Sequence, residues 1–153
     1  MKNIVLIIAG GVGARMGQDI PKQFINVYDK PVIVYTLEAF QKHPSIDAIE
    51  VVCLDGWHDV LWAYAKQFGI AKLENIVSGG KNGQDSIRNG LYDIASRHNG
   101  SDDIVLVHDA IRPMVSNDII SDNIRVCRQY GNAITVVPVS YTHLRAHETE
   151  ADL

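Results

Sequence analysis

The chain has 153 residues, of which 46% are hydrophobic and 21% charged, and its net charge is −4. This length suits one domain with a substantial core, and the acidic balance argues against a nucleic-acid-binding domain, which would carry a basic excess. The longest apolar run is about six residues, far short of the roughly 20 that a membrane helix needs. The residues after Met1 lack the pattern of an export signal. We therefore expect Cys53 and Cys127 to be buried, reduced thiols of a cytoplasmic protein.

The first expected strand, residues 4–8, leads directly into a glycine-rich loop at residues 9–17. Its short, β-branched apolar run predicts a strand buried on both faces. Glycines allow the main chain to approach a polyanion and to present N–H groups to phosphate oxygens. Arg15 on the loop and Lys22 after Pro21 add two positive charges. This combination predicts a phosphate site, and the alternative is an ordinary glycine-rich turn between a strand and a helix.

Two common glycine motifs do not match this loop. The dinucleotide pattern G-x-G-x-x-G, started at Gly11, places Met16 where the third glycine belongs. The P-loop pattern requires Lys and then Ser or Thr after its last glycine, but Gly17 is followed by Gln18. An oxidoreductase domain that binds NAD therefore remains only a less favoured alternative.

Apolar patterns predict alternating helices and strands along the rest of the chain. In chain order we first expect an extended piece at 24–27, a turn at 28–31, a helix at about 31–43 and a strand at 48–54. A helix around 61–68 that stops at Gly69 and a short strand at 76–77 follow, and a second glycine-rich loop at 78–86 then opens a helix that ends at Asn99-Gly100. The last expected elements are a strand at 104–107, a helix capped by Ser116 or Asn117 and stopped by Gly131, and a fifth strand at 133–139.

This alternation predicts an α/β fold in which a mainly parallel sheet is covered by helices on both faces. Right-handed crossovers place every strand-to-helix loop at the same edge of such a sheet. Three unusual loops should therefore share one rim: the first glycine loop, the Gly79-Gly80 loop, and residues 108–113.

Three stretches resemble a known family. A-G-G-x-G-x-R-M-G over residues 9–17 resembles the first loop of the nucleotidylyltransferases, and Pro21-Lys22-Gln23 narrows the resemblance to the cytidylyltransferases that act on methylerythritol phosphate or ribitol phosphate. Residues 107–113 and 79–91 resemble two further signatures of the same family. The resemblance extends from Met1 to about Val139.

The resemblance implies a Rossmann-like nucleotidyltransferase fold and a reaction of isoprenoid or teichoic-acid biosynthesis. CTP and a sugar-alcohol phosphate, either 2-C-methyl-D-erythritol 4-phosphate or D-ribitol 5-phosphate, would give a CDP-alcohol and pyrophosphate with Mg²⁺ as cofactor. Arg15 and Lys22 would stabilise the transition state, and Asp109 would hold the metal. The implied CTP-binding residues are Ile8, Ala9, Gly10, Gly11, Gly13, Gly79, Gly80, Ser86 and Ala110.

Several of these residues also have a purely structural interpretation. Asp109 could be a turn residue with Arg112 as its ion-pair partner. Ser86, at the start of a helix, could donate to a ribose or phosphate or simply be a helix N-cap. We expect His108 to be packed or hydrogen-bonded at the end of its strand rather than to act as a base.

The end of the chain departs from the family pattern. Family members continue well beyond Val139, with an arm exchanged across a homodimer and late Arg and Lys residues that hold the sugar phosphate. Residues 140–153 do not resemble that continuation. We therefore expect residues 1–139 to be the CTP-binding part of a fold that is incomplete at its C-terminus, and 140–153 to be a disordered or artefactual tail. On this expectation the chain alone is neither active nor dimeric, and a non-catalytic nucleotide-binding fragment is the alternative.

Overall fold

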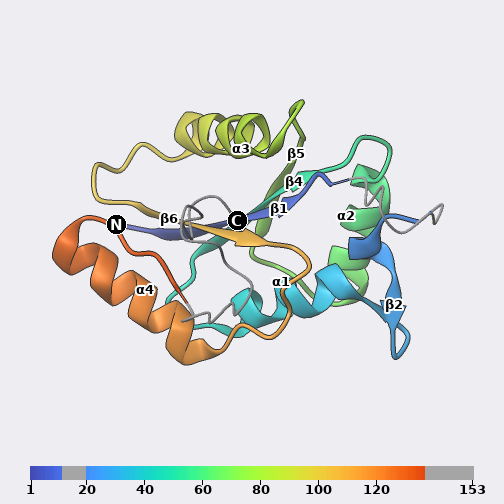
Figure 1. The fold of residues 1–153 in the computed structure, drawn as a ribbon, viewed down its shortest axis with the longest axis horizontal. Helices are drawn as coiled ribbons and strands as arrows, with labels where there is room; N and C mark the ends of the chain where they lie inside the picture. Colours follow the sequence, from blue (N-terminus) through green and yellow to red (C-terminus); the bar gives the residue numbers. More distant parts are fainter. Residues whose placement is uncertain (12–19, 137–153) are drawn as a thin grey trace, which may run out of the picture.

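The structure, a computed structural model, describes residues 1–11 and 20–136 (Figure 1). Strands and helices alternate along these residues, with one short 3₁₀ helix after Pro21. In chain order the elements are β1 (Asn3–Ala9), η2 (Lys22–Phe24), β2 (Asn26–Val27), β3 (Lys30–Pro31), α1 (Val32–Lys42), β4 (Ala48–Cys53), α2 (His58–Gln67), β5 (Leu73–Ser78), α3 (Gly83–Arg97), β6 (Ile104–Asp109) and α4 (Asn117–Tyr130).

Four strands form one parallel sheet in the order β5-β4-β1-β6. β1 lies between β4 and β6, and Ile4 is in register with Ala48 on one side and Val105 on the other. Because all four strands run the same way, their carboxyl ends meet at one edge of the sheet. The predicted parallel α/β fold is confirmed.

Helices cover both faces of the sheet, with α3 above it and α1 and α4 below it in Figure 1. One core lies under α3 and includes Ile4 and Leu6 of β1. The other core contains Val5 and Ile7 together with buried residues of α1, α2 and α4. Consecutive residues of β1 therefore alternate between two cores, as the period of a strand requires, and the prediction that this strand is buried on both faces is confirmed.

α3 packs very closely on the sheet at Gly90. A Cβ on this residue would lie 2.5 Å from Leu6 Cδ1 and 2.9 Å from Val52 Cγ2, so a larger residue would displace the helix or the strand side chains. The helix ends at Arg97, and His98 follows in an extended conformation. The prediction that Asn99-Gly100 ends this helix was wrong, because the chain leaves the helix earlier.

The other helix ends agree better with expectation. Ser116 caps α4, its hydroxyl accepting a hydrogen bond from the N–H of Ile119, and Gly131 ends the helix at φ +88°. The turn predicted at 28–31 is shorter in the structure: Tyr28 and Asp29, both with positive φ, connect the paired strands β2 and β3, and Lys30 and Pro31 form β3 itself. None of the described helices is long and apolar enough to cross a membrane.

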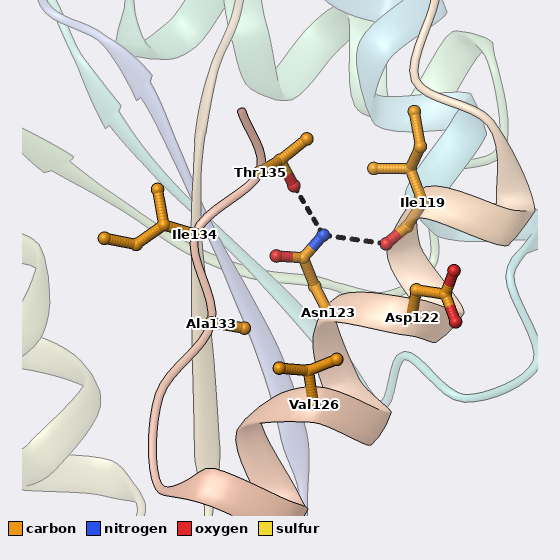
Figure 2. A pocket seen from close by; sticks show the side chains of 7 residues that line it. All are labelled: Ile119, Asp122, Asn123, Val126, Ala133, Ile134 and Thr135. Carbon is orange, nitrogen blue, oxygen red and sulfur yellow. Dashed lines mark hydrogen bonds between the residues drawn. The ribbon is translucent and has the colours of Figure 1, made fainter. Parts of the chain in front are cut away.

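The predicted fifth strand is not found over residues 133–136, and residues 137–139 lie outside the described part of the chain. Residues 133–136 pair with no strand and instead lie beside α4, where Asn123 Nδ2 donates to Thr135 Oγ1 over 2.6 Å (Figure 2). The side chains of Ile134 and Val136 are 84% and 78% exposed. The apolar run that suggested a strand has no partner strand among the described residues that would bury it.

Candidate functional site

The described parts of the three loops, which for the first loop are residues 9–11, lie at the carboxyl edge of the sheet. The third loop is tied to the end of β1, directly before the first loop, because the N–H of Ala110 donates to Ile8 O over 3.0 Å. The second loop is tied to the end of β4 because the N–H of Gly79 donates to Cys53 O over 3.1 Å. Burial raises the pKa of the Cys53 thiol to about 11, so this cysteine is a packing residue and not a nucleophile.

The two glycine loops lie against one another. A Cβ on Gly10 would lie 3.6 Å from the Cα of Gly79 and 3.5 Å from Ser86 Oγ. A Cβ on Gly79 would lie at similar distances from Gly10 and Ser86. The main chains of both loops therefore border the same space, with the buried Ser86 hydroxyl between them.

Ser86 closes the second loop and does not cap the helix. Its hydroxyl donates to Asn82 O over 3.0 Å and accepts from the N–H of Gly80 over 2.9 Å. The N-cap is Asn82, whose side chain accepts from the N–H of Asp85. A Cβ on Gly80 would lie 2.3 Å from the Cβ of Asp85, so the loop can fold back on α3 only with glycine at this position.

The third loop carries an exposed ion pair. Arg112 Nε donates to Asp109 Oδ2 over 2.9 Å, and the two side chains are 73% and 53% exposed. His108 Nε2 lies 2.9 Å from Arg112 O, and its ring packs edge-on against Phe40. The predicted structural role of His108 is confirmed. The ion-pair alternative for Asp109 is also present, although exposed pairs of this kind contribute little to stability and leave the second carboxylate oxygen available.

Lys22 and Gln23 approach the first loop from η2. Lys22 is half-buried, and no carboxylate among the described residues pairs with it. Gln23 is 2% exposed, and its Nε2 donates to Ala9 O over 2.7 Å and to Gly11 O over 3.1 Å. Arg15 and Gly13 lie outside the described residues, so their assignments stay predictions.

Three residues that hold the loops of this rim in place were not predicted from the sequence: Gln23, Thr36 and Asn82. Gln23 was noticed as part of Pro21-Lys22-Gln23, but its two hydrogen bonds require the fold to be known. Thr36, wholly buried in α1, donates through Oγ1 to Ala110 O over 2.7 Å. Asn82 was passed over in favour of Ser86, although Asn is as good an N-cap residue as Ser.

The residues at the rim are compatible with a divalent cation that also binds a substrate. The described residues contain no group of three or more His, Cys, Asp or Glu side chains able to hold a metal. Mg²⁺, however, is commonly held by one or two carboxylates together with substrate phosphates. Asp109 supplies one exposed carboxylate beside the first loop, since it is in register with Ile8.

Two hollows in the described surface lie elsewhere. One, of about 220 Å³, lies between α4 and residues 133–135 (Figure 2). A second, of about 390 Å³, lies between η2 and α2 and includes the stacked rings of Phe24 and Trp57, whose centroids are 4.5 Å apart. Neither of these two hollows is lined by a glycine of the rim.

Comparison with protein families agrees with this arrangement. The model of the IspD family, 2-C-methyl-D-erythritol 4-phosphate cytidylyltransferase, matches residues 3–151. The chain belongs to the IspD family. The resemblance inferred from the three signatures is thereby confirmed, and the alternative of an NAD-binding oxidoreductase is not supported.

IspD-family relatives carry two different names. A ribitol-5-phosphate cytidylyltransferase of Lacticaseibacillus paracasei is 49% identical over 87% of this chain and 56% of its own length. A 2-C-methyl-D-erythritol 4-phosphate cytidylyltransferase of Clostridium botulinum is 43% identical over 86% of this chain and 56% of its own length. The chain thus spans little more than half the length of these curated relatives.

Solved structures of the IspD family have the same fold. The 2-C-methyl-D-erythritol 4-phosphate cytidylyltransferase of Francisella tularensis superposes with a TM-score of 0.62 at 32% identity, covering 82% of this chain and 51% of that one. A 4-diphosphocytidyl-2C-methyl-D-erythritol synthase superposes with a TM-score of 0.69 at 27% identity, covering 98% of this chain and 67% of that one.

Proposed function

We propose that this chain is the CTP-binding part of a cytidylyltransferase that transfers CMP from CTP to a sugar-alcohol phosphate, releasing pyrophosphate. The observation that carries the proposal is that the described residues of the three family signatures lie at one rim, with Gly10 so close to Gly79 and Ser86 that a Cβ would touch both, and with Ala110 bonded to Ile8 of β1. The division of the chain near Val139 belongs to the same proposal.

The transfer brings two anions together, because a phosphate oxygen attacks the α-phosphorus of a triphosphate. Such a site must neutralise charge and hold the reactants in line. We assign main-chain N–H groups of Gly10 and Gly11 to the phosphates and Arg15 and Lys22 to the charge that develops in the transition state. Lys22 suits this role because no described carboxylate neutralises it.

The base and ribose of CTP are assigned to the second and third loops. Ile8 and Ala9 at the end of β1 and Gly13 of the first loop are also assigned to CTP. Gly79 and Gly80 would present backbone groups to the cytosine, and Ala110 would border the ribose. The Ser86 hydroxyl already donates to Asn82 O. Its proposed contribution to CTP binding is therefore to hold Gly80 in place and to accept hydrogen bonds.

We assign the divalent cation, proposed to be Mg²⁺, to Asp109. When bound, the cation would neutralise phosphate charge and help the pyrophosphate to leave. The chain's own contribution is the free carboxylate oxygen of Asp109, which Arg112 orients through the other oxygen.

Ribitol 5-phosphate is the acceptor to test first. The relative with 49% identity carries that name, whereas the methylerythritol-phosphate relative has 43% identity. We propose that the residues that recognise the acceptor lie in the region that only the longer relatives contain. The contacts that would form a homodimer are proposed to lie in the same region.

The proposal is tested by calorimetric titration of this chain with Mg·CTP, Mg·UTP, Mg·ATP and Mg·GTP. We expect binding of CTP at least about tenfold tighter than of either purine nucleotide. Pyrophosphate release is then followed with each acceptor in a version of the protein as long as its relatives, where Arg15→Ala and Lys22→Ala should each lower the rate about a hundredfold. Equal affinity for all four nucleotides, or release unaffected by both substitutions, would contradict the proposal.

A further inference from the structure

Gln23 has a buried side-chain amide with both of its hydrogens in use. A glutamine amide offers two N–H donors, and here one is directed to Ala9 O at 2.7 Å and one to Gly11 O at 3.1 Å. The side chain is 2% exposed. Breaking these bonds would leave the carbonyl of the buried Ala9 without its partner, which is costly, whereas Gly11 is exposed.

The two carbonyls bracket Gly10, at the start of the glycine loop. In a planar trans peptide, the C=O of one residue and the N–H of the next point in opposite directions. The Ala9 carbonyl is turned towards Gln23, so the N–H of Gly10 is turned away from it. Among the described residues, no acceptor competes with a ligand for the N–H of Gly10 or Gly11.

Gln23 also ties the neighbouring cation to the loop. Lys22 and Gln23 belong to the same 3₁₀ turn, which is closed by a 2.8 Å hydrogen bond from the N–H of Phe24 to Pro21 O. Phe24 anchors that turn by stacking on Trp57. The main chain of Lys22 is thus tied to the glycine loop through the neighbouring Gln23 amide.

We propose that Gln23 is a positioning residue for the nucleotide phosphates, because its amide turns two carbonyl oxygens away from them and ties the main chain of Lys22 to the glycine loop. A carbonyl oxygen facing a phosphate would repel it, so both effects favour anion binding. This inference rests on the proposed function, since it takes the phosphates to be those of CTP.

The test compares Gln23→Met with a matched control, Asn3→Leu. Both replacements remove a buried side-chain amide of similar size. Asn3 is 4% exposed and donates through Nδ2 to Ser45 O over 2.7 Å at the opposite, amino end of β1. We expect both variants to lose thermal stability, but only Gln23→Met to raise the Kd for Mg·CTP, by roughly tenfold or more, the loss that two hydrogen bonds can account for.

A second measurement needs no variant and so does not depend on whether Gln23→Met folds. Amide exchange in the unaltered chain should be fast at Gly10 and Gly11 and should slow on addition of Mg·CTP. Tight CTP binding without protection of either glycine, or an unchanged Kd in Gln23→Met, would overturn this inference and leave the proposed function standing. Failure of the unaltered chain to bind CTP would overturn both.

Discussion

At the scale of single residues, Asp109 has both a structural and a functional interpretation. Its ion pair with Arg112 spans one turn of exposed chain, where the pair gains little energy and can be exchanged for another cation. The sequence predicts this carboxylate at the carboxyl end of a buried strand. The structure confirms its place at that end of β6, but β6 is an edge strand of the described sheet and none of its residues is buried, so that part of the prediction was wrong. The sequence does not predict what binds the second carboxylate oxygen of Asp109, because that partner is a ligand.

Asp109→Asn keeps the shape of the side chain and removes its charge. We expect the Kd for Mg·CTP to rise about tenfold or more, while the free energy of unfolding without ligand changes by less than about 1 kcal/mol. The measurement is calorimetric titration combined with thermal unfolding. Asp122→Asn is the matched control, since Asp122 forms a similarly exposed pair with Arg125 on α4. A large loss of stability with unchanged affinity would show that Asp109 is a structural turn residue.

At the scale of elements, α3 joins the candidate site to a buried charged cluster. Its amino end carries the second glycine loop, and its last residue, Arg97, pairs with Glu50 of β4, Glu74 of β5 and Asp93 of α3 itself. Glu50 is 1% exposed, and its Oε1 has no hydrogen-bond partner among the described residues. Burial first, and then the neighbouring Asp93, raise the pKa of Glu50 to about 8 despite Arg97.

This pKa predicts a pH dependence of stability. Between the ordinary value of 4.5 and about 8, the folded state holds a proton on Glu50 that the unfolded state has released, so the free energy of unfolding falls as the pH rises through that window. Glu50→Gln should remove this slope and stabilise the protein at pH 8 relative to the parent, by about 1 kcal/mol or more. Denaturant unfolding at pH 5, 6, 7 and 8 measures it. A parent slope retained in Glu50→Gln would contradict the prediction.

The elements themselves were largely predictable, and the errors have local causes. Apolar runs and helix spacing were enough for β1, β4, α1 and α4, because burial on one or two faces imposes those patterns. The expected strand at 133–139 was wrong over its described residues because an apolar run does not show whether a partner strand is present. The expected end of α3 at Asn99-Gly100 lies beyond the observed end at Arg97, because His98 already adopts an extended conformation.

At the scale of the whole molecule, one topological rule predicted the site. Alternating strands and helices with right-handed crossovers place every strand-to-helix loop at one edge, and this brought residues far apart in the sequence, such as Ile8 and Ala110, into hydrogen-bond contact. The rule does not predict which buried side chains hold the loops of the rim in place. The bonds of Gln23 and Thr36 depend on the packing of η2 and α1, which no pattern in the sequence specifies.

The central claim, that the three loops at this rim form the CTP site, is tested most directly by mapping Mg·CTP onto the chain through its backbone amide NMR signals. The predicted result is that the largest shifts fall on Gly10 and Gly11, on Gly79 and Gly80, and on Ala110, with little change around the α4 hollow of Figure 2. Shifts confined to that hollow or to the surroundings of Trp57, or no shifts at all at saturating CTP, would contradict it.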